Sequence, residues 1–263
     1  MGIIVGGNTM SGNFSSSGDT QNTPGIVTRG LVLHFDTSNA SSFDNSGYYY
    51  DCGYGCQYYS SNPGCTNCNN KLVDLSGYGH DGSIYNISIT NLASGPSFTF
   101  NGSNSYVNVT HTSTIAPSSG VISIGAWFSS TEVGTQNDRI IFNKENVFEL
   151  SAGGGYITYA FRPNLAWVGA TAFNINQWYH AMVTYDQSYQ RLYVNGVEVY
   201  NAALSGAIGN TYSNDLRFGA RNAPGTPTSP FKGYIPVMQM YNVALTASEV
   251  LELYNNGRQR FAI

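Results

Sequence analysis

Four cysteines within one short stretch are the residues whose type and spacing most clearly suggest chemistry. Cys52, Cys56, Cys65 and Cys68 follow the pattern Cys-x3-Cys-x8-Cys-x2-Cys. Four thiolates this close in sequence could bind a tetrahedral Zn²⁺ ion in a closed structural site. They could equally form two disulfides, in more than one connectivity. A reducing cytoplasm favours zinc and an oxidising exterior permits disulfides, so the sequence leaves both open.

The cysteines lie in an unusually long insertion, residues 38–70, which has few aliphatic side chains. Zinc or disulfides would hold together a loop that has too little core of its own. The loop also carries candidate binding residues that offer large, rigid contact areas, namely Tyr48, Tyr49, Tyr50, Tyr54, Tyr58 and Tyr59. These tyrosines could stack on a sugar, pack on a neighbouring subunit or cover the edge of their own domain.

Carboxylates are the other residues that could do chemistry, since glycoside hydrolysis needs two carboxyl groups about 5–10 Å apart. None of the glutamates is followed by an aspartate two residues later, the arrangement of catalytic strands in jelly-roll glucanases. Glu145 and Glu149 flank a predicted turn, and Glu249 and Glu252 lie on a predicted helix. The histidines are also separate from one another. The sequence therefore predicts a protein that is not an enzyme, with no catalytic residues.

Composition narrows the class of protein further. Of the 263 residues, 10% are charged and 14% are aromatic, and the net charge is −4. Without a basic stripe, nucleic-acid binding is disfavoured, and no apolar run is long enough to span a membrane. The start of the chain lacks the basic and apolar regions of a signal peptide, which predicts synthesis in a cytoplasm. The many Gly, Tyr, Ser and Asn residues favour an all-β fold with many turns.

The stretch from Gln177 to Tyr200 is the clearest local element. Apolar and polar residues alternate from Tyr179 to Tyr185, which is typical of a half-buried strand. Two further strands, Arg191–Val194 and Val197–Tyr200, are separated only by Asn195-Gly196. Because Asn-Gly supplies the positive φ angles of a type I′ turn, this segment predicts three antiparallel strands.

Shorter runs of the same kind predict a β-sandwich. The first is Ile26–Phe35, with Leu31, Leu33 and Phe35 on one side, followed by a turn at 79–82. Further strands are expected at 97–100, 106–109, 121–128, 139–142, 147–150, 156–161, 166–170, 216–219 and 234–241. One helix is expected at 247–255, with a capping box of Thr246 and Glu249 and with Gly257 as its C′ residue.

Several segments, taken in order, resemble the laminin-G-like, concanavalin A-like jelly-roll family. They are GLVLHFD (30–36), DLSGYGHDG (74–82), FNGSNSYV (100–107), QWYH (177–180), LYVNG (192–196), FKGYI (231–235) and YNVALTASE (241–249). This version is similar to domains of virion structural proteins in tailed bacteriophages. The resemblance implies an antiparallel two-sheet sandwich with one short C-terminal helix and a binding or structural role.

One departure bears on cofactors. Some members of the family bind Ca²⁺, which needs several hard oxygen ligands. The family pattern Phe-Asp-Gly-x-x-Asp-Tyr is here Phe100-Asn101-Gly102-Ser103-Asn104-Ser105-Tyr106, so both aspartates are missing. Calcium is therefore disfavoured, and a structural zinc ion at the cysteines is the other cofactor to consider.

Residues 1–25 are predicted to be an N-terminal arm outside the jelly-roll domain, which spans 26–263. The arm has few apolar side chains, chiefly Ile3, Ile4, Val5 and Phe14, which could dock on a partner subunit. The leading prediction is a non-enzymatic virion protein, a bacteriophage capsid decoration (cement) protein or a tail or fibre component. Its partners would be other virion subunits and copies of itself. The alternative is a carbohydrate-binding, lectin-like module for host or surface attachment, and a glycanase is the third reading.

Overall fold

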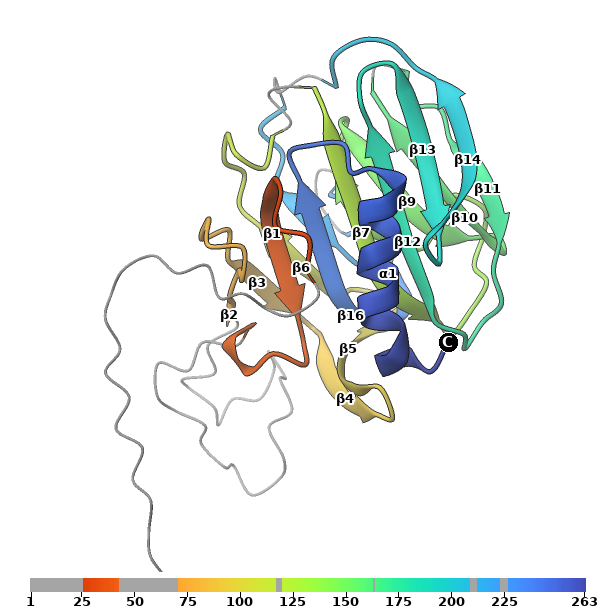
Figure 1. Ribbon diagram of the computed structural model, residues 1–263. Coiled ribbons are helices and arrows are strands. Elements are labelled where there is room, and N and C mark those ends of the chain that lie inside the picture. The colour runs from red at the N-terminus through yellow and green to blue at the C-terminus, as the bar shows by residue number, and fades with distance from the viewer. Residues whose placement is uncertain (1–25, 43–70, 117–119, 163, 209–211, 223–226) are drawn as a thin grey trace, which may run out of the picture.

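The computed structural model describes residues 26–42, 71–116, 120–162, 164–208, 212–222 and 227–263, which form two packed antiparallel sheets and one α-helix (Figure 1). Sheet A contains, in spatial order, β14 (Val197–Ala203), β13 (Tyr189–Val194), β12 (Tyr179–Tyr185), β7 (Ile122–Ser130), β16 (Lys232–Tyr241), β5 (Gly95–Asn101) and β4 (Ser88–Leu92). Strand β1 (Leu31–Asp36) also belongs to this sheet, because it pairs with the last part of β16 while β5 pairs with the first part.

Sheet B contains β11 (Val168–Ala172), β10 (Tyr156–Phe161), β9 (Phe148–Gly153), β8 (Ile140–Lys144), β15 (Leu216–Phe218), β6 (Tyr106–Val109), β3 (Gly82–Tyr85) and β2 (Lys71–Leu72). The prediction of an antiparallel two-sheet sandwich is confirmed. Within the described residues, no helix has the length and apolar character that a membrane crossing requires.

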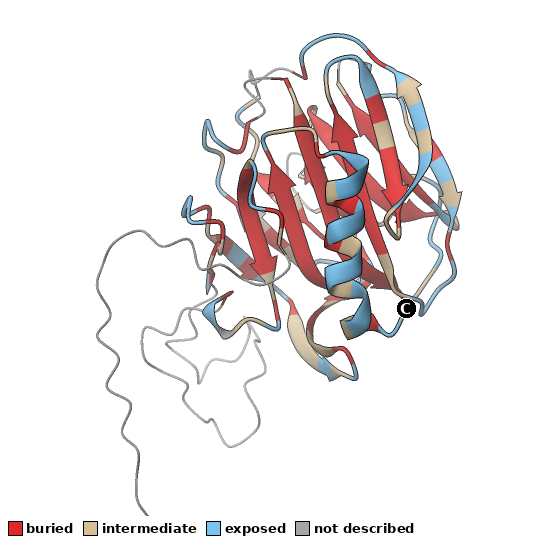
Figure 2. Cartoon of the chain, in the orientation of Figure 1, coloured by how far each residue is buried: buried red, intermediate tan, exposed pale blue. Residues whose placement is uncertain are grey.

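The core lies between the sheets and takes side chains from both. Alternate residues of β10 point inward, namely Ile157, Tyr159 and Phe161, and they meet residues of sheet A such as Val183 and Leu192 in one buried cluster. The strands that face this cluster are buried along most of their length (Figure 2). Because side chains alternate across a strand, the other half of each strand in sheet B must face away from the core.

The central hairpin has the predicted form. Strand β12 pairs with β13, and β13 pairs with β14 across Asn195-Gly196. Asn195 and Gly196 have φ angles of 51° and 78°, as a type I′ turn requires. On its other side β12 pairs with β7, which places the hairpin at the edge of sheet A.

The first strand differs from its prediction in two ways. It begins at Leu31 rather than Ile26, because the preceding residues form a turn that ends at Gly30, with φ 71°. A β-bulge follows, since Leu31 pairs with Tyr241 and Leu33 with Met240. Leu31 therefore joins the cluster under the helix, whereas Leu33 and Phe35 join the central core.

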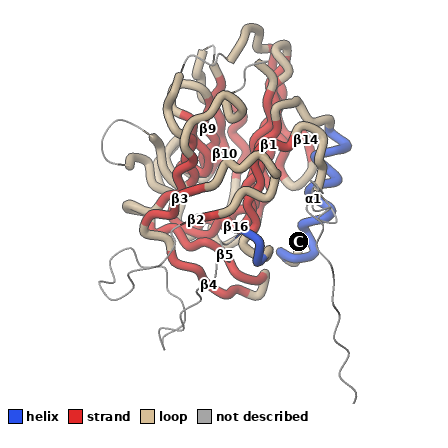
Figure 3. The backbone as a smooth tube through the Cα atoms, turned by 90° about the vertical axis from the view of Figure 1, so that its left-hand side faces the viewer, coloured by secondary structure: helices blue, strands red, loops and turns tan. Residues whose placement is uncertain are grey.

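Helix α1 (Ala247–Phe261) packs on the outer face of sheet A (Figures 1 and 3). Its predicted capping box is confirmed: the Thr246 side chain accepts from the Glu249 amide, and the Glu249 carboxylate accepts from the Thr246 amide. The predicted end was wrong, because the helix continues past Gly257 to Phe261. A Cβ atom on Gly257 would lie 2.6 Å from Trp127 Nε1, so glycine at this position allows close contact with the sheet.

Strands β2, β3 and β4 were not predicted. The turn before β3 is built around Asp74, whose Oδ1 accepts from the backbone amides of His34 and Ser76. Its Oδ2 accepts from the Ser76 hydroxyl and the His80 amide. The carboxylate thus fastens this turn to β1, which is the physical role of the segment DLSGYGHDG.

Candidate functional site

The outer face of sheet B presents a row of polar side chains across the sheet. The register aligns one residue from each of six neighbouring strands, β2 to β9, in the order Lys71, Ser83, Asn108, Arg217, Asn143 and Glu149. On β6, β15 and β9, the residues before and after the polar one are core residues, which fixes Asn108, Arg217 and Glu149 outward. The row is exposed or half-buried at its β2–β15 end and buried at β8 and β9.

At the open end, two tyrosines and an arginine form a ladder. Tyr85 and Tyr106 are directly paired in the register of β3 and β6, and their rings stack with centroids 4.5 Å apart and an interplanar angle of 15°. The Arg217 guanidinium lies over the Tyr106 ring, 4.4 Å from its centroid. Tyr85 is 40% exposed. Because β3, β6 and β15 are consecutive in the sheet, the order of the ladder is Tyr85, Tyr106, Arg217.

Hydrogen bonds hold the ladder in place. Arg217 Nε donates to Asn108 Oδ1 at 3.1 Å, and Asn108 Nδ2 donates to Asp215 Oδ2 at 2.9 Å. Asp215 Oδ1 accepts from the His111 amide at 2.9 Å. Burial raises the pKa of Tyr106 against the opposing effect of the Arg217 charge, so this phenol is neutral at pH 7 and can donate one hydrogen bond.

At the buried end of the row, Glu145 and Glu149 converge on Arg221. Arg221 Nη2 lies 2.5 Å from Glu149 Oε2, and Arg221 Nε lies 3.9 Å from Glu145 Oε2. Burial raises the pKa of Glu149, and the adjacent Arg221 opposes this shift. Sequence reasoning did not foresee that these two carboxylates would meet on a sheet face. Because one guanidinium bridges both, the arrangement is a structural ion-pair cluster rather than a free acid and base.

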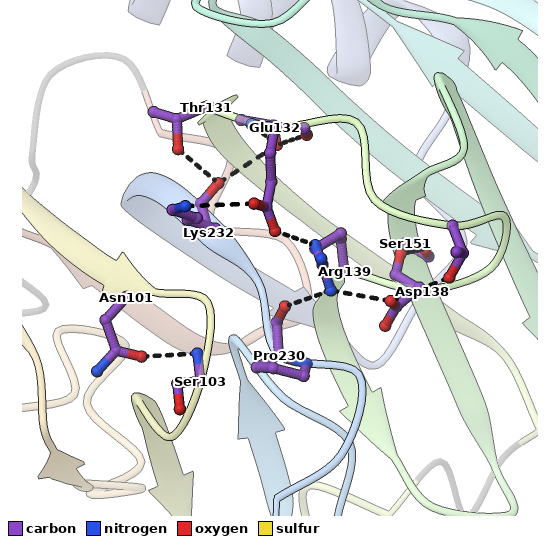
Figure 4. Close-up of polar contacts among 11 residues, drawn as sticks. Asn101, Ser103, Thr131, Glu132, Asp138, Arg139, Ser151, Pro230 and Lys232 are labelled. Carbon is purple, nitrogen blue, oxygen red and sulfur yellow. Dashed lines mark hydrogen bonds and ion pairs between the residues drawn. The ribbon is translucent and has the colours of Figure 1, made fainter.

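A second charged cluster ties loops together at one end of the sandwich (Figure 4). Arg139 Nε lies 2.6 Å from Glu132 Oε1, as an ion pair without hydrogen-bond alignment, and Arg139 Nη1 lies 2.8 Å from Asp138 Oδ2. The same Nη1 donates to the Pro230 carbonyl at 3.3 Å. Lys232 Nζ completes the cluster, 3.3 Å from Glu132 Oε2. These charges are matched internally, which makes the cluster a clamp between the β7–β8 loop and the segment before β16.

Asn101 has a local structural role in the loop where the family pattern has its first aspartate. Its Oδ1 accepts from the amides of Ser103 and Asn104 and from the Ser105 hydroxyl (Figure 4 draws the Ser103 bond). This oxygen therefore serves its own loop rather than an ion. Among the described residues, no three His, Cys, Asp or Glu side chains gather as a metal site would require. That calcium is disfavoured therefore stays a prediction from the sequence.

The candidate site residues named from the sequence all lie outside the described residues. They are the four cysteines (Cys52, Cys56, Cys65, Cys68), the six tyrosines (Tyr48, Tyr49, Tyr50, Tyr54, Tyr58, Tyr59) and the arm residues Ile3, Ile4, Val5 and Phe14. The zinc or disulfide site, the tyrosine loop and the docking arm therefore stay predictions.

Sequence reasoning missed Tyr85, Tyr106 and Arg217 as site residues. Tyr106 and Arg217 lie in predicted strands, but nothing local in the sequence brings them together. Tyr85 lies in β3, whose four residues alternate between buried and exposed. That alternation, Gly82 and Ile84 against Ser83 and Tyr85, is the signal that could have identified the strand.

Comparison with known proteins supports the architecture. A family model described as the concanavalin A-like lectin/glucanases superfamily matches residues 101–251. A search of curated protein sequences finds no match.

Three solved structures share the fold. Domain 4 of AbnA, a GH43 extracellular arabinanase from Geobacillus stearothermophilus, in complex with arabinotriose, has a TM-score of 0.57 at 20% identity, covering 85% of this chain and 98% of its own. The binding domain of Paraclostridial Mosquitocidal Protein 1 has a TM-score of 0.57 at 19% identity, covering 71% and 49%. The botulinum neurotoxin type G receptor binding domain has a TM-score of 0.58 at 17% identity, covering 86% and 51%. This chain thus spans about half the length of the two toxin domains, and at these identities the likeness concerns the fold.

Proposed function

Because the chain belongs to the concanavalin A-like lectin/glucanase superfamily, we propose that it is a non-catalytic, glycan-binding module, and that the ladder of Tyr85, Tyr106 and Arg217 on sheet B receives the sugar. Two of the three similar structures are named as binding domains, and the third is a domain of an arabinanase in complex with arabinotriose, which supports this reading over an enzymatic one.

The observation that carries the proposal is the stacked tyrosine pair on an otherwise polar sheet face. A sugar ring has a face of C–H groups and an edge of hydroxyl groups. A tyrosine offers an apolar ring face together with a polar tip, so it complements both features. One ring face of Tyr85 is covered by Tyr106, and among the described residues no second aromatic ring stacks on the other. Ser83 and Asn108 stand beside the pair in the polar row and can hydrogen-bond hydroxyl groups.

The same face gives little support to catalysis. The carboxylates that lie close together there, Glu145 and Glu149, are both bound to Arg221. A glycosidase needs one carboxylic acid that can donate a proton and one carboxylate that can attack or activate water. Because one arginine pairs with both carboxylates, neither is free for these roles, which suits a structural ion-pair cluster.

The three similar structures do not support the virion role that the sequence resemblance led us to expect. The three similar structures are a binding domain of a mosquitocidal protein, a toxin receptor binding domain and a domain of an arabinanase. A capsid, tail or fibre location, with virion partners and self-assembly, therefore stays a prediction, and the glycan-binding alternative is the reading that the fold relatives favour.

The first test is binding of the labelled protein to a printed oligosaccharide array that includes arabino-oligosaccharides, sialylated glycans and oligogalacturonates. Tyr85→Ala and Tyr106→Ala should each weaken binding to the recognised glycans at least about tenfold. This is the loss of binding free energy usual when an aromatic side chain that stacks on the ligand is truncated. Tyr156→Ala is the matched control, because Tyr156 is an exposed, outward-facing tyrosine of the same sheet, on β10. Equal loss in all three variants, or no loss in the first two, would contradict the assignment of the ladder.

A further inference from the structure

Arg217 forms no ion pair with a described carboxylate, unlike most arginines in the described part of the chain. Five others form ion pairs with carboxylates: Arg29, Arg139, Arg191, Arg221 and Arg260. Arg217 forms none with any described residue. Its hydrogen bonds go to neutral acceptors, the Asn108 side-chain oxygen at 3.1 Å and the Arg221 carbonyl at 3.4 Å.

The neighbouring acid does not neutralise this arginine directly. Asp215 accepts from Asn108 Nδ2 and from the His111 amide, each at 2.9 Å, and it makes no ion pair with Arg217. The Arg217 charge is therefore balanced by no direct ion pair among the described residues.

The Arg217 guanidinium is also held in a fixed position. It lies over the Tyr106 ring and is hydrogen-bonded to Asn108 through Nε, so little side-chain freedom remains to be lost when a ligand binds. A guanidinium has five N–H groups in one plane, and two of them are used in these hydrogen bonds. The remaining N–H groups match the two oxygens of a planar carboxylate.

We propose that the sugar bound at the Tyr85–Tyr106–Arg217 ladder carries a carboxylate, as uronic and sialic acids do, and that Arg217 binds this group. The inference rests on the proposed glycan-binding function and specifies its ligand class. The tyrosine pair supplies contact with the sugar ring, which is common to all sugars. Arg217 supplies selection for the acidic ones, because a cation already paired within the protein could not do so without losing its partner.

The test compares an acidic sugar with its neutral methyl ester. Isothermal titration of the full-length protein with oligogalacturonate and with its fully methyl-esterified form compares the acid with its neutral ester on one backbone. The wild type should bind the acid about tenfold or more tightly than the ester, the effect expected for a hydrogen bond to a charged group. Sialyllactose against lactose is the second arm, which separates a sialic acid from a uronic acid as the source of the carboxylate.

Arg217→Gln should lose the preference for the acid, so that the acid and the ester bind to this variant with equal affinity. Arg258→Gln is the control, since Arg258 also lies near a tyrosine ring, that of Tyr254, and forms no described ion pair, but it is on α1 beside sheet A. This variant should retain the full preference. Equal affinity of the wild type for acid and ester, or an acid preference that survives Arg217→Gln, would overturn the inference and leave glycan binding standing. Binding of none of the four ligands, together with a silent array, would overturn the proposed function itself.

Discussion

His180 is a fully buried imidazole whose two ring nitrogens have no hydrogen-bond partner among the described residues. It lies on β12 under α1, beside the rings of Trp127 and Tyr254. Burial in this apolar setting lowers the pKa of His180 to about 3. The ring is therefore neutral in the folded protein, and it acts as an aromatic packing residue rather than as an acid or base.

This depressed pKa predicts acid sensitivity. The unfolded chain binds a proton at His180 below its usual pKa of 6.5, but the folded chain does so only near pH 3. The contribution of His180 to stability is thus fully present above about pH 6.5 and is lost as the pH falls toward 3, by on the order of 3–5 kcal/mol. His180→Phe should be as stable at pH 7 and should unfold less readily at pH 4 than the wild type, as measured by urea titration.

A second buried histidine sets the background for that experiment. Burial lowers the pKa of His34 to about 4, so part of the acid sensitivity should survive in His180→Phe. If the pH dependence of unfolding were the same in the variant and the wild type, the inference that His180 is buried and neutral in the folded protein would be wrong.

At the scale of elements, the start of α1 is joined to the turn that precedes β1. Arg29 donates from Nε and Nη2 to the two carboxylate oxygens of Glu249, at 2.6 Å each, while Glu249 also closes the capping box with Thr246. The hydrogen bonds from Arg29, with those from Thr246, hold the pKa of Glu249 down at about 2. The Glu249 side chain therefore joins α1 to the turn before β1.

Glu249→Gln should lower the free energy of unfolding at pH 7 by about 1 kcal/mol, since it weakens a cap and an ion pair in which Arg29 is half exposed. The Glu249 contribution is present above about pH 4.5 and is lost as the pH falls toward 2. Thermal unfolding of the wild type and of Glu249→Gln at pH 7 and pH 3 measures this difference in stability. Glu252→Gln, an exposed change on the same helix, is the control and should leave both values unchanged.

The sequence predicted elements that carry their own local signals. The Asn195-Gly196 turn and the Thr246 capping box each depend on residues close in sequence, and both are confirmed. The predicted end of α1 was wrong, because glycine at position 257 allows close contact with Trp127 and does not terminate the helix. Trp127 is 130 positions away in the sequence, so no local pattern reveals this contact. The ladder could not be predicted for the same reason. Tyr85, Tyr106 and Arg217 become neighbours only through the order of β3, β6 and β15.

At the scale of the molecule, the two faces of the sandwich have different roles. Helix α1 packs on the outer face of sheet A (Figures 2 and 3). Trp127, Met182 and Tyr241 are buried there. The outer face of sheet B carries polar residues, with an exposed aromatic end. Helix α1 therefore completes the core on one side of the domain, and the outer face of sheet B is the face on which we propose glycan recognition.

This division predicts opposite outcomes for two truncations. Ending the chain before Thr246 would expose several large apolar side chains of sheet A, each worth roughly 1.5–3 kcal/mol when fully buried. Their sum is comparable to the whole stability of a typical domain, about 5–15 kcal/mol. We therefore expect this shortened protein to aggregate or to lose its cooperative thermal transition, as measured by circular dichroism and size-exclusion chromatography.

Removal of residues 1–25 should instead preserve the transition and the proposed glycan binding of the full chain, because Val27 and Leu31 already complete the cluster under α1. The prediction would be contradicted if the protein without residues 1–25 lost its cooperative transition while the protein without the helix kept it. The arm, and not α1, would then complete the core.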